Sequence, residues 1–277
     1  MTTPVRIGCV KYLNTLPLVE GLATLKDAEV VAAVPSSLIG MLRGGKVDVA
    51  LCSVIDAARH DDVRCLPAGM IGCDGPTMTV RLFSRVPFSR ITSVGVDTDS
   101  HTSAVLMQVV LNRKWGLRPR SADVDARDTR SVGGRAELDA VLLIGDKVMT
   151  DAPDAAAFPH QLDLGEAWKE MTGLPFVYAV WMCRAGDEQC DAVRLADAVL
   201  DRQRRHNTTR LDWIVHRRAG ERHWPEPAAA EYVGRRLKFD VGEEEREAVA
   251  KFIAWARELG LCDGSGVQWA ASSPCAC

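Results

Sequence analysis

The chain has 277 residues, of which 47% are hydrophobic and 26% are charged, and this composition is typical of one or two globular domains. Its net charge of −3 and pI of about 6.1 exclude the strongly basic surface on which binding to nucleic acid depends. A small anion remains a suitable ligand, because hydroxyl groups and helix N-termini bind anions without a basic surface.

The termini and the cysteines restrict the class of protein further. MTTPVRIGCV lacks a basic n-region and an apolar h-region, and no apolar run approaches the roughly 20 residues that span a bilayer. We therefore expect a cytoplasmic protein without a membrane partner. The nine cysteines include no C-x-x-C pair, and their odd number argues against a complete disulfide framework. Cys275 and Cys277 lie on a Ser/Pro tail that we expect to be disordered over 265–277.

The first part of the chain alternates strands and helices. Strands are predicted over 5–10, 28–34 and 47–53, and a helix is predicted after each of the first two. This alternation predicts a parallel sheet with both faces covered. Residues 66–84 have the pattern of a strand pair that leads out of this first lobe.

The same alternation begins again after Pro87. Further strands are predicted over 93–97, 139–145 and 176–182, and helices over 102–115, 188–206 and 243–259. We therefore expect an α/β protein of two lobes with a ligand cleft between them. Residues 1–85 together with 184–277 form the first lobe, and residues 86–183 form the second.

Four segments are predicted to face this cleft. Ligands of open α/β sheets bind beyond the carboxyl ends of the strands, where helix N-termini converge. Tyr12–Thr15, Thr98–Ser103 and Gly145–Asp146 each follow such a strand. Asp74–Val80 lies just before the crossover between the lobes.

The residue types in these segments suit the binding of an anion. Ser100, Thr102 and Ser103 place hydroxyl groups at a helix N-terminus, which can hold a carboxylate without a positive charge. The alternative is an ordinary helix N-cap. Asp146 is either a general base or orienting group, or a loop aspartate that caps the next turn. The sequence has no P-loop, no G-x-G-x-x-G motif, no His/Cys metal spacing and no G-x-S-x-G elbow, so we predict neither a metal nor a cofactor.

A set of longer segments carries a resemblance to a known family. The segments are "RIGCVKYLNTLPL", "VPSSLIGMLRGGKVDVALCSV", "GCDGPTMTVRLFS", "VDTDSHTSAVL", "DAVLLIGD" and "LDLGEAWKEMTGLPFVYAVW". Their order and spacing resemble chorismate dehydratase, the first enzyme of the futalosine route to menaquinone, from about residue 5 to 255. The resemblance implies a fold like that of the type II periplasmic binding proteins, each lobe a mostly parallel sheet flanked by helices. It also implies the loss of water from chorismate to give 3-[(1-carboxyvinyl)oxy]benzoate, without metal or organic cofactor.

The resemblance also implies site residues. Asn14 matches the asparagine of the family's Tyr-Leu-Asn-Thr segment, and Thr79 replaces the serine of its Gly-Pro-x-x-Ser segment. In the family's Ser-Arg-Thr-Ser helix start, His101 replaces the arginine. Our hypothesis is that Asn14 and Thr79 position the reacting region of the substrate, whose own enolpyruvyl carboxylate takes the proton. The residues predicted to bind the dianionic substrate are Tyr12, Thr15, Ser100, Thr102, Ser103, Gly145 and Asp146.

Two other functions fit the same pattern. One is a cytosolic small-anion-binding protein of this fold without catalysis, although transport receptors work outside the cytoplasm and carry a signal peptide. The other is the sister enzyme 1,4-dihydroxy-6-naphthoate synthase, whose N-terminal segment is rich in Ser, Pro, Cys, Asn and Asp, unlike Lys11–Leu18. The sequence makes no prediction of the oligomeric state.

Overall fold

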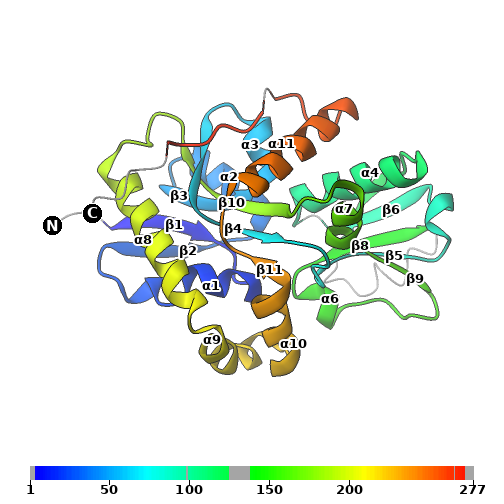
Figure 1. The fold of residues 1–277 in the computed structure, drawn as a ribbon, viewed down its shortest axis with the longest axis horizontal. Coiled ribbons are helices and arrows are strands. Elements are labelled where there is room, and N and C mark those ends of the chain that lie inside the picture. The colour runs from blue at the N-terminus through cyan, green and yellow to red at the C-terminus, as the bar shows by residue number, and fades with distance from the viewer. Residues whose placement is uncertain (1–3, 98, 125–137, 265, 272–277) are drawn as a thin grey trace.

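A computed structural model describes residues 4–97, 99–124, 138–264 and 266–271 of the chain. Two sheets lie side by side, each flanked by helices (Figure 1). The strands of the first sheet are β1 (Val5–Cys9), β2 (Ala28–Ala32), β3 (Val49–Ser53), β4 (Val63–Cys73), β10 (Phe176–Arg184) and β11 (Leu237–Lys238). Those of the second are β5 (Val80–Ser84), β6 (Ser93–Asp97), β7 (Arg120–Val124), β8 (Ala140–Ile144) and β9 (His160–Asp163).

Helices cover both sheets. We define the first lobe as the first sheet with the helices packed on it. Its helices are η1 (Leu13–Thr15), α1 (Leu16–Val19), η2 (Leu22–Thr24), α2 (Pro35–Arg43), α3 (Val54–Arg59), α8 (Asp191–Thr208), α9 (Leu211–Arg218), η4 (Gly220–Arg222), α10 (Glu226–Glu231), the π-helical turn η5 (Tyr232–Arg236) and α11 (Glu243–Glu258). The second lobe carries η3 (Phe88–Arg90), α4 (His101–Trp115), α6 (Lys147–Thr150) and α7 (Leu164–Thr172).

Both sheets are mixed. The first has the order β11-β4-β10-β3-β1-β2 and the second the order β7-β6-β8-β5-β9. The strand–helix alternation predicted from the sequence forms the parallel parts, in which β2, β1 and β3 pair in one sheet and β7, β6 and β8 in the other. The remaining pairs are antiparallel. The carboxyl ends of β1, β3, β6 and β8 are followed by the turns that position the site.

The chain changes sheet at points that differ from the predicted lobe boundaries. The predicted strand pair over 66–84 is divided, because β4 lies in the first sheet and β5 in the second. Strand β10 lies in the first sheet, where it pairs with β3 on one side and with β4 on the other. Its apolar sequence suits this central position. By sheet membership the chain crosses within 74–79 and 164–175, and the lobe boundaries after 85 and 183 remain predictions.

One carboxylate fixes both crossings. Asp163 accepts hydrogen bonds from the N–H groups of Thr77 (3.0 Å) and Met78 (2.8 Å) in the first crossing. The same carboxylate caps α7 by accepting from the N–H groups of Gly165 (3.0 Å) and Glu166 (3.2 Å). Met78 has a φ of 67°, a left-handed conformation that a residue with a side chain adopts at some cost. These bonds hold the strained turn in place.

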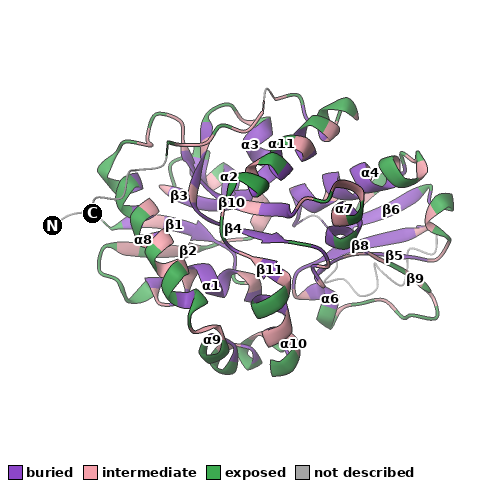
Figure 2. Cartoon of the chain, in the orientation of Figure 1, coloured by how far each residue is buried: buried purple, intermediate pink, exposed green. Residues whose placement is uncertain are grey.

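The core is continuous between the lobes. The central strands are buried along most of their length, and the helices expose their outward faces (Figure 2). One buried cluster extends from α2 and α3 through β10 to α4 and α7. Within it the rings of Trp168, Phe176 and Phe252 contact one another edge to face, with centroids 5.0–6.1 Å apart. The predicted helices at 188–206 and 243–259 are α8 and α11, and α11 packs on both α3 and α4.

Part of the predicted disordered tail is ordered against the first sheet. The N–H of Cys65 donates to the carbonyl of Gln268 (2.9 Å), and the carbonyl of Cys65 accepts from the N–H of Ala270 (2.8 Å). The guanidinium of Arg246 lies 4.6 Å from the centre of the Trp269 ring. Residues 265 and 272–277, with Cys275 and Cys277, lie outside the described residues.

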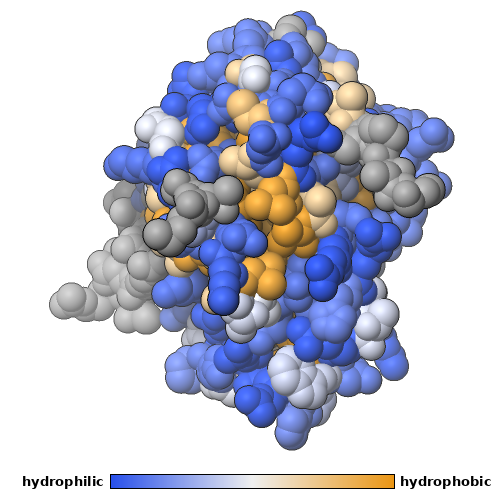
Figure 3. All heavy atoms as spheres, turned by 90° about the vertical axis from the view of Figure 1, so that its left-hand side faces the viewer, coloured by the Kyte–Doolittle hydropathy of each residue, from blue (hydrophilic) through white to orange (hydrophobic). Residues whose placement is uncertain are grey.

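The face on which the N-terminus lies is mostly hydrophilic, and its largest group of apolar side chains lies near the centre (Figure 3). Among the described residues, no helix has the length and the continuous apolarity that a bilayer span requires.

Candidate functional site

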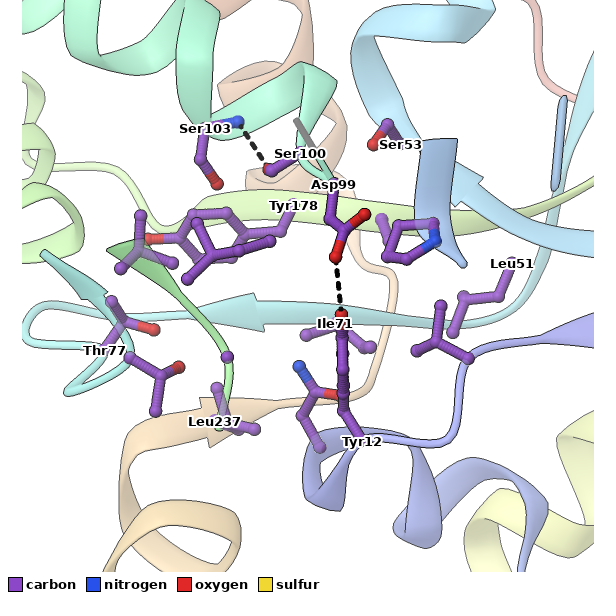
Figure 4. Close-up of a pocket in the computed structure, with 18 of the residues that line it drawn as sticks. Tyr12, Leu51, Ser53, Ile71, Thr77, Asp99, Ser100, Ser103, Tyr178 and Leu237 are labelled. Carbon is purple, nitrogen blue, oxygen red and sulfur yellow. Dashed lines mark hydrogen bonds between the residues drawn. The ribbon is translucent and has the colours of Figure 1, made fainter. Parts of the chain in front are cut away.

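A cavity lies between the two sheets, at the carboxyl ends of β1, β3, β6 and β8 (Figure 4). Its volume of about 80 Å³ is several times what one water molecule needs, so the side chains leave room for a ligand. Both lobes and the first crossing contribute to it. The lining residues are Val10, Tyr12, Asn14, Pro35, Leu51, Ser53, Ile71, Thr77, Thr79, Val80, Asp99, Ser100, Ser103, Ile144, Gly145, Tyr178, Ala179, Tyr232 and Leu237.

All four predicted segments reach this cavity, but not all of their predicted residues line it. Those that line it are Tyr12, Asn14, Thr79, Ser100, Ser103 and Gly145. Thr15, Thr102 and Asp146 are not among the lining residues, and Thr98 lies outside the described residues. The sequence therefore predicted which segments reach the cavity, but not which of their side chains point into it.

The three side chains behind the lining have structural partners. The Thr15 hydroxyl donates to the carbonyls of Val10 (3.0 Å) and Tyr12 (2.8 Å) and so closes the turn after β1. The Thr102 hydroxyl accepts from the N–H of Ile55 at 3.4 Å.

The carboxylate of Asp146 accepts from the Trp224 indole N–H at 2.9 Å, and burial raises the pKa of Asp146 above its usual range. Asp146 joins the two lobes behind the lining of the cavity.

The turn after β1 brings an amide to the cavity. Tyr12 is extended, with φ −87° and ψ 162°, and η1 begins directly after it. Pro17 lies in the first turn of α1, where its missing N–H costs no hydrogen bond. The Oδ1 atom of Asn14 is buried and has no hydrogen-bond partner among the described residues. A buried acceptor without a donor is rare in folded proteins, and here it lies on a residue that lines the cavity.

The N-terminus of α4 supplies the hydroxyl groups. Ser100 is the N-cap, and its Oγ accepts from the N–H of Ser103 at 3.2 Å (Figure 4). Both serines also line the cavity. The two alternatives for this segment, a helix cap and a ligand site, therefore apply together. The dipole of this helix of 15 residues favours an anion at the same end.

A buried group of charges beside the cavity was not predicted. Lys147 Nζ lies 2.8 and 2.9 Å from the two carboxylate oxygens of Asp97 and 2.8 Å from Oδ2 of Asp99. Burial raises the pKa of Asp97, against the opposing effect of Lys147. From the other lobe the Tyr12 hydroxyl donates to Asp99 Oδ2 at 3.3 Å, across the cavity (Figure 4). The sequence did contain a signal for this group of charges, namely charged residues at the ends of the strands predicted over 93–97 and 139–145.

Tyrosine side chains complete the lining. All three tyrosines of the chain, Tyr12, Tyr178 and Tyr232, are lining residues. Tyr178 lies in β10. Tyr232 lies in η5, 86 residues after Asp146, the last residue of the four predicted segments, and no local motif marks it. Among the described residues that line the cavity, Asp99 alone carries a formal charge and none is Lys or Arg. Helix N-termini and hydroxyl groups are thus the groups available to an anion.

Solved structures share the fold. A protein from Archaeoglobus fulgidus matches with a TM-score of 0.71 and 16% identity, covering 93% of this chain and 98% of its own. The periplasmic aliphatic sulphonate binding protein of Escherichia coli matches with a TM-score of 0.63 and 14% identity, covering 96% of each chain. These neighbours confirm the predicted two-lobed, periplasmic-binding-protein-like fold.

Sequence comparison gives the family. A chorismate dehydratase from Thermus thermophilus is 31% identical over 199 residues, which cover 65% of this chain and 70% of that protein. The model of a family described as menaquinone biosynthesis matches residues 5–258, which contain the whole span over which the resemblance was noted. The chain therefore belongs to the menaquinone biosynthesis family.

Proposed function

We propose that this protein is a chorismate dehydratase, a hydro-lyase of the futalosine route to menaquinone that works in the cytoplasm. The observation that carries the proposal is the identity of 31% to the chorismate dehydratase of Thermus thermophilus. The cavity supports it, because its hydroxyl and amide groups suit a polar substrate. No group of three or more His, Cys, Asp and Glu side chains that could hold a metal occurs among the described residues.

The chemistry asks little of the protein. The C3–H bond and the C4–O bond of chorismate break, and the proton and the hydroxide leave together as water. Because the product ring is aromatic, most of the driving force lies in the substrate. The site has to hold two carboxylates and to orient the leaving hydroxyl group. Fixed dipoles in the cavity stabilise the charge that develops on that hydroxyl group.

The proposed roles follow the positions of the side chains. Ser103 and the N–H groups at the start of α4 bind one carboxylate, with Ser100 holding the helix end in shape. Asn14 and Thr79 lie on the reacting region, and the enolpyruvyl carboxylate of the substrate accepts the C3 proton. Tyr12 and Gly145 close the cavity from opposite lobes, with Gly145 in a left-handed conformation (φ 61°). Thr15, Thr102 and Asp146 support the site from behind its lining.

The direct test is turnover. The purified protein is incubated with chorismate, and the aromatic product is followed by absorbance and identified by mass spectrometry. We expect conversion without added metal or cofactor. Binding of chorismate without turnover would contradict the proposal and favour a receptor of the same fold.

The role of Asn14 has its own test. We expect Asn14→Ala to lower kcat by about 10²-fold or more, because the amide would be lost from the reacting region. Asn112→Ala is the matched control. Asn112 lies on α4, its amide donates to the carbonyl of Leu117 (3.4 Å), and it does not line the cavity. An Asn14→Ala variant with the turnover of the unsubstituted protein would remove Asn14 from the mechanism.

A further inference from the structure

Tyr232 is a cavity residue that neither the sequence pattern nor the proposed roles above use. Its side chain is buried, with 1% of the residue exposed, and it is nevertheless part of the cavity lining. It comes from the π-helical turn η5 in the first lobe. π-Helical turns are rare and occur frequently at functional sites. The position therefore merits a chemical explanation.

The ring of Tyr232 is held in place by a side chain that is itself bonded to the other lobe. It stacks on the ring of Trp224, with centroids 5.1 Å apart and planes inclined by 6°. Trp224 in turn donates its indole N–H to Asp146 of the second lobe at 2.9 Å. Two χ angles describe the whole side chain, so this stacking fixes the position of the phenolic oxygen. The oxygen is presented to the cavity by a rigid support.

The phenolic oxygen is hydrogen-bonded to Thr79. The Thr79 Oγ1 and Tyr232 Oη atoms are 2.6 Å apart, and this bond joins the first crossing to the first lobe. The two hydroxyl groups together carry two protons and use one of them in the bond between them. Whichever group donates, one proton remains for another acceptor. Burial raises the pKa of Tyr232, so the phenol keeps its proton at neutral pH.

The remaining proton has no acceptor assigned within the site. Burial is the main cause of the raised pKa of Tyr232, and the neighbouring amide of Asn14 acts in the opposite direction. The Oδ1 atom of the same amide is buried and accepts from none of the described residues. The three side chains thus present one spare donor and one spare acceptor to the cavity. A hydroxyl group, which both accepts and donates a hydrogen bond, satisfies both.

We propose that Tyr232 is a catalytic residue that, paired with Thr79, donates a hydrogen bond to the hydroxyl group that leaves the substrate. Asn14 Oδ1 accepts the hydrogen of that hydroxyl group. The donated bond strengthens as negative charge develops on the departing oxygen, so it stabilises the transition state more than the bound substrate. This inference rests on the proposed dehydration of chorismate.

The test compares Tyr232→Phe with the unsubstituted protein. Phenylalanine keeps the ring and its stacking on Trp224 and removes only the hydroxyl group. We expect kcat to fall by about 10²-fold, with KM changed by less than about threefold. The affinity for the product 3-[(1-carboxyvinyl)oxy]benzoate should stay the same, because the product lacks the leaving hydroxyl group. A merely structural role would instead weaken product binding or lower the melting temperature.

A pair of Thr79 variants checks the partner. Thr79→Val should lower kcat as Tyr232→Phe does, whereas Thr79→Ser, which keeps the hydroxyl group, should keep the kcat of the unsubstituted protein. The kcat of the double variant Tyr232→Phe/Thr79→Val should be little lower than that of either single variant. If the unsubstituted protein dehydrates chorismate and Tyr232→Phe does so at the same kcat, the role of Tyr232 is overturned and the proposed function stands. Equal losses in chorismate turnover and product affinity would likewise overturn it. No turnover by the unsubstituted protein would overturn the proposed function itself, and this inference with it.

Discussion

Lys147 lies between two largely buried carboxylates, those of Asp97 and Asp99. Its side chain is 10% exposed, and those of Asp97 and Asp99 are 0% and 13% exposed. Charges removed from water are costly unless they are paired and hydrogen-bonded. One lysine neutralises one of the two aspartates, and the Tyr12 hydroxyl donates a further bond to Asp99. The group therefore shapes the second lobe's side of the cavity without adding a positive charge to its lining.

Removal of this lysine should be strongly destabilising. We expect Lys147→Met to lower the free energy of unfolding by about 3–5 kcal/mol, because both carboxylates then lose their cation. Urea denaturation followed by tryptophan fluorescence measures the change. Lys169→Met is the control, since Lys169 and Asp74 form an ion pair whose side chains are 38% and 45% exposed. An exposed pair contributes at most about 1 kcal/mol. Similar losses in the two variants would contradict the burial argument.

At the scale of residues, the sequence predicted which turns form the site but not which side chains enter it. Thr102 and Ser103 are adjacent at the start of α4, and successive residues of a helix point in directions about 100° apart. Ser103 consequently lines the cavity, whereas Thr102 contacts Ile55. Tyr232 could not be predicted, because its place depends on how the C-terminal helices pack, which no local pattern encodes. The roles assigned to these residues remain predictions.

Among the elements, those with apolar periodicity were predicted closely. The helix expected over 102–115 is α4, which ends before Gly116 in a left-handed conformation (φ 71°). The strands β7 and β9 were not predicted. Both are edge strands with mainly polar sequences, so they lack the apolar signal on which strand prediction depends. Residues 125–137, which follow β7, lie outside the described residues.

The two crossings between the sheets depend on one element end, the N-cap of α7. We expect Asp163→Ala to lower the free energy of unfolding by about 2–4 kcal/mol, since it removes a helix cap and leaves buried N–H groups of Thr77 and Met78 without an acceptor. Asp163→Asn keeps one acceptor oxygen and should lose less. Denaturant unfolding of the three proteins gives the comparison. A loss below about 1 kcal/mol in Asp163→Ala would show that the crossings hold without this carboxylate.

The molecule as a whole is held closed around the cavity by polar contacts from lobe to lobe. Tyr12 meets Asp99 and Trp224 meets Asp146, while Thr79 of the first crossing meets Tyr232 of the first lobe. A further contact lies outside the lining, where His101 Nδ1 is 2.8 and 3.0 Å from the carboxylate oxygens of Asp56. Asp56 is on α3 of the first lobe and is 1% exposed. His101 occupies the position of the family's arginine, and its partner here is a buried carboxylate rather than the cavity.

The contact between His101 and Asp56 should therefore act on closure and not on the chemical step. We expect His101→Ala to raise KM for chorismate by about 10-fold or more, because a hydrogen bond to a charged group is worth about 1.5–3 kcal/mol and each 1.4 kcal/mol is a factor of ten. The kcat at saturating chorismate should change by less than about threefold. His101→Arg keeps a donor beside Asp56 and should bind chorismate as the unsubstituted protein does. Steady-state kinetics measure both constants, and small-angle X-ray scattering should show a larger radius of gyration for His101→Ala alone. A lower kcat with an unchanged KM would instead place His101 in the chemistry, although its side chain contacts Asp56 and does not line the cavity.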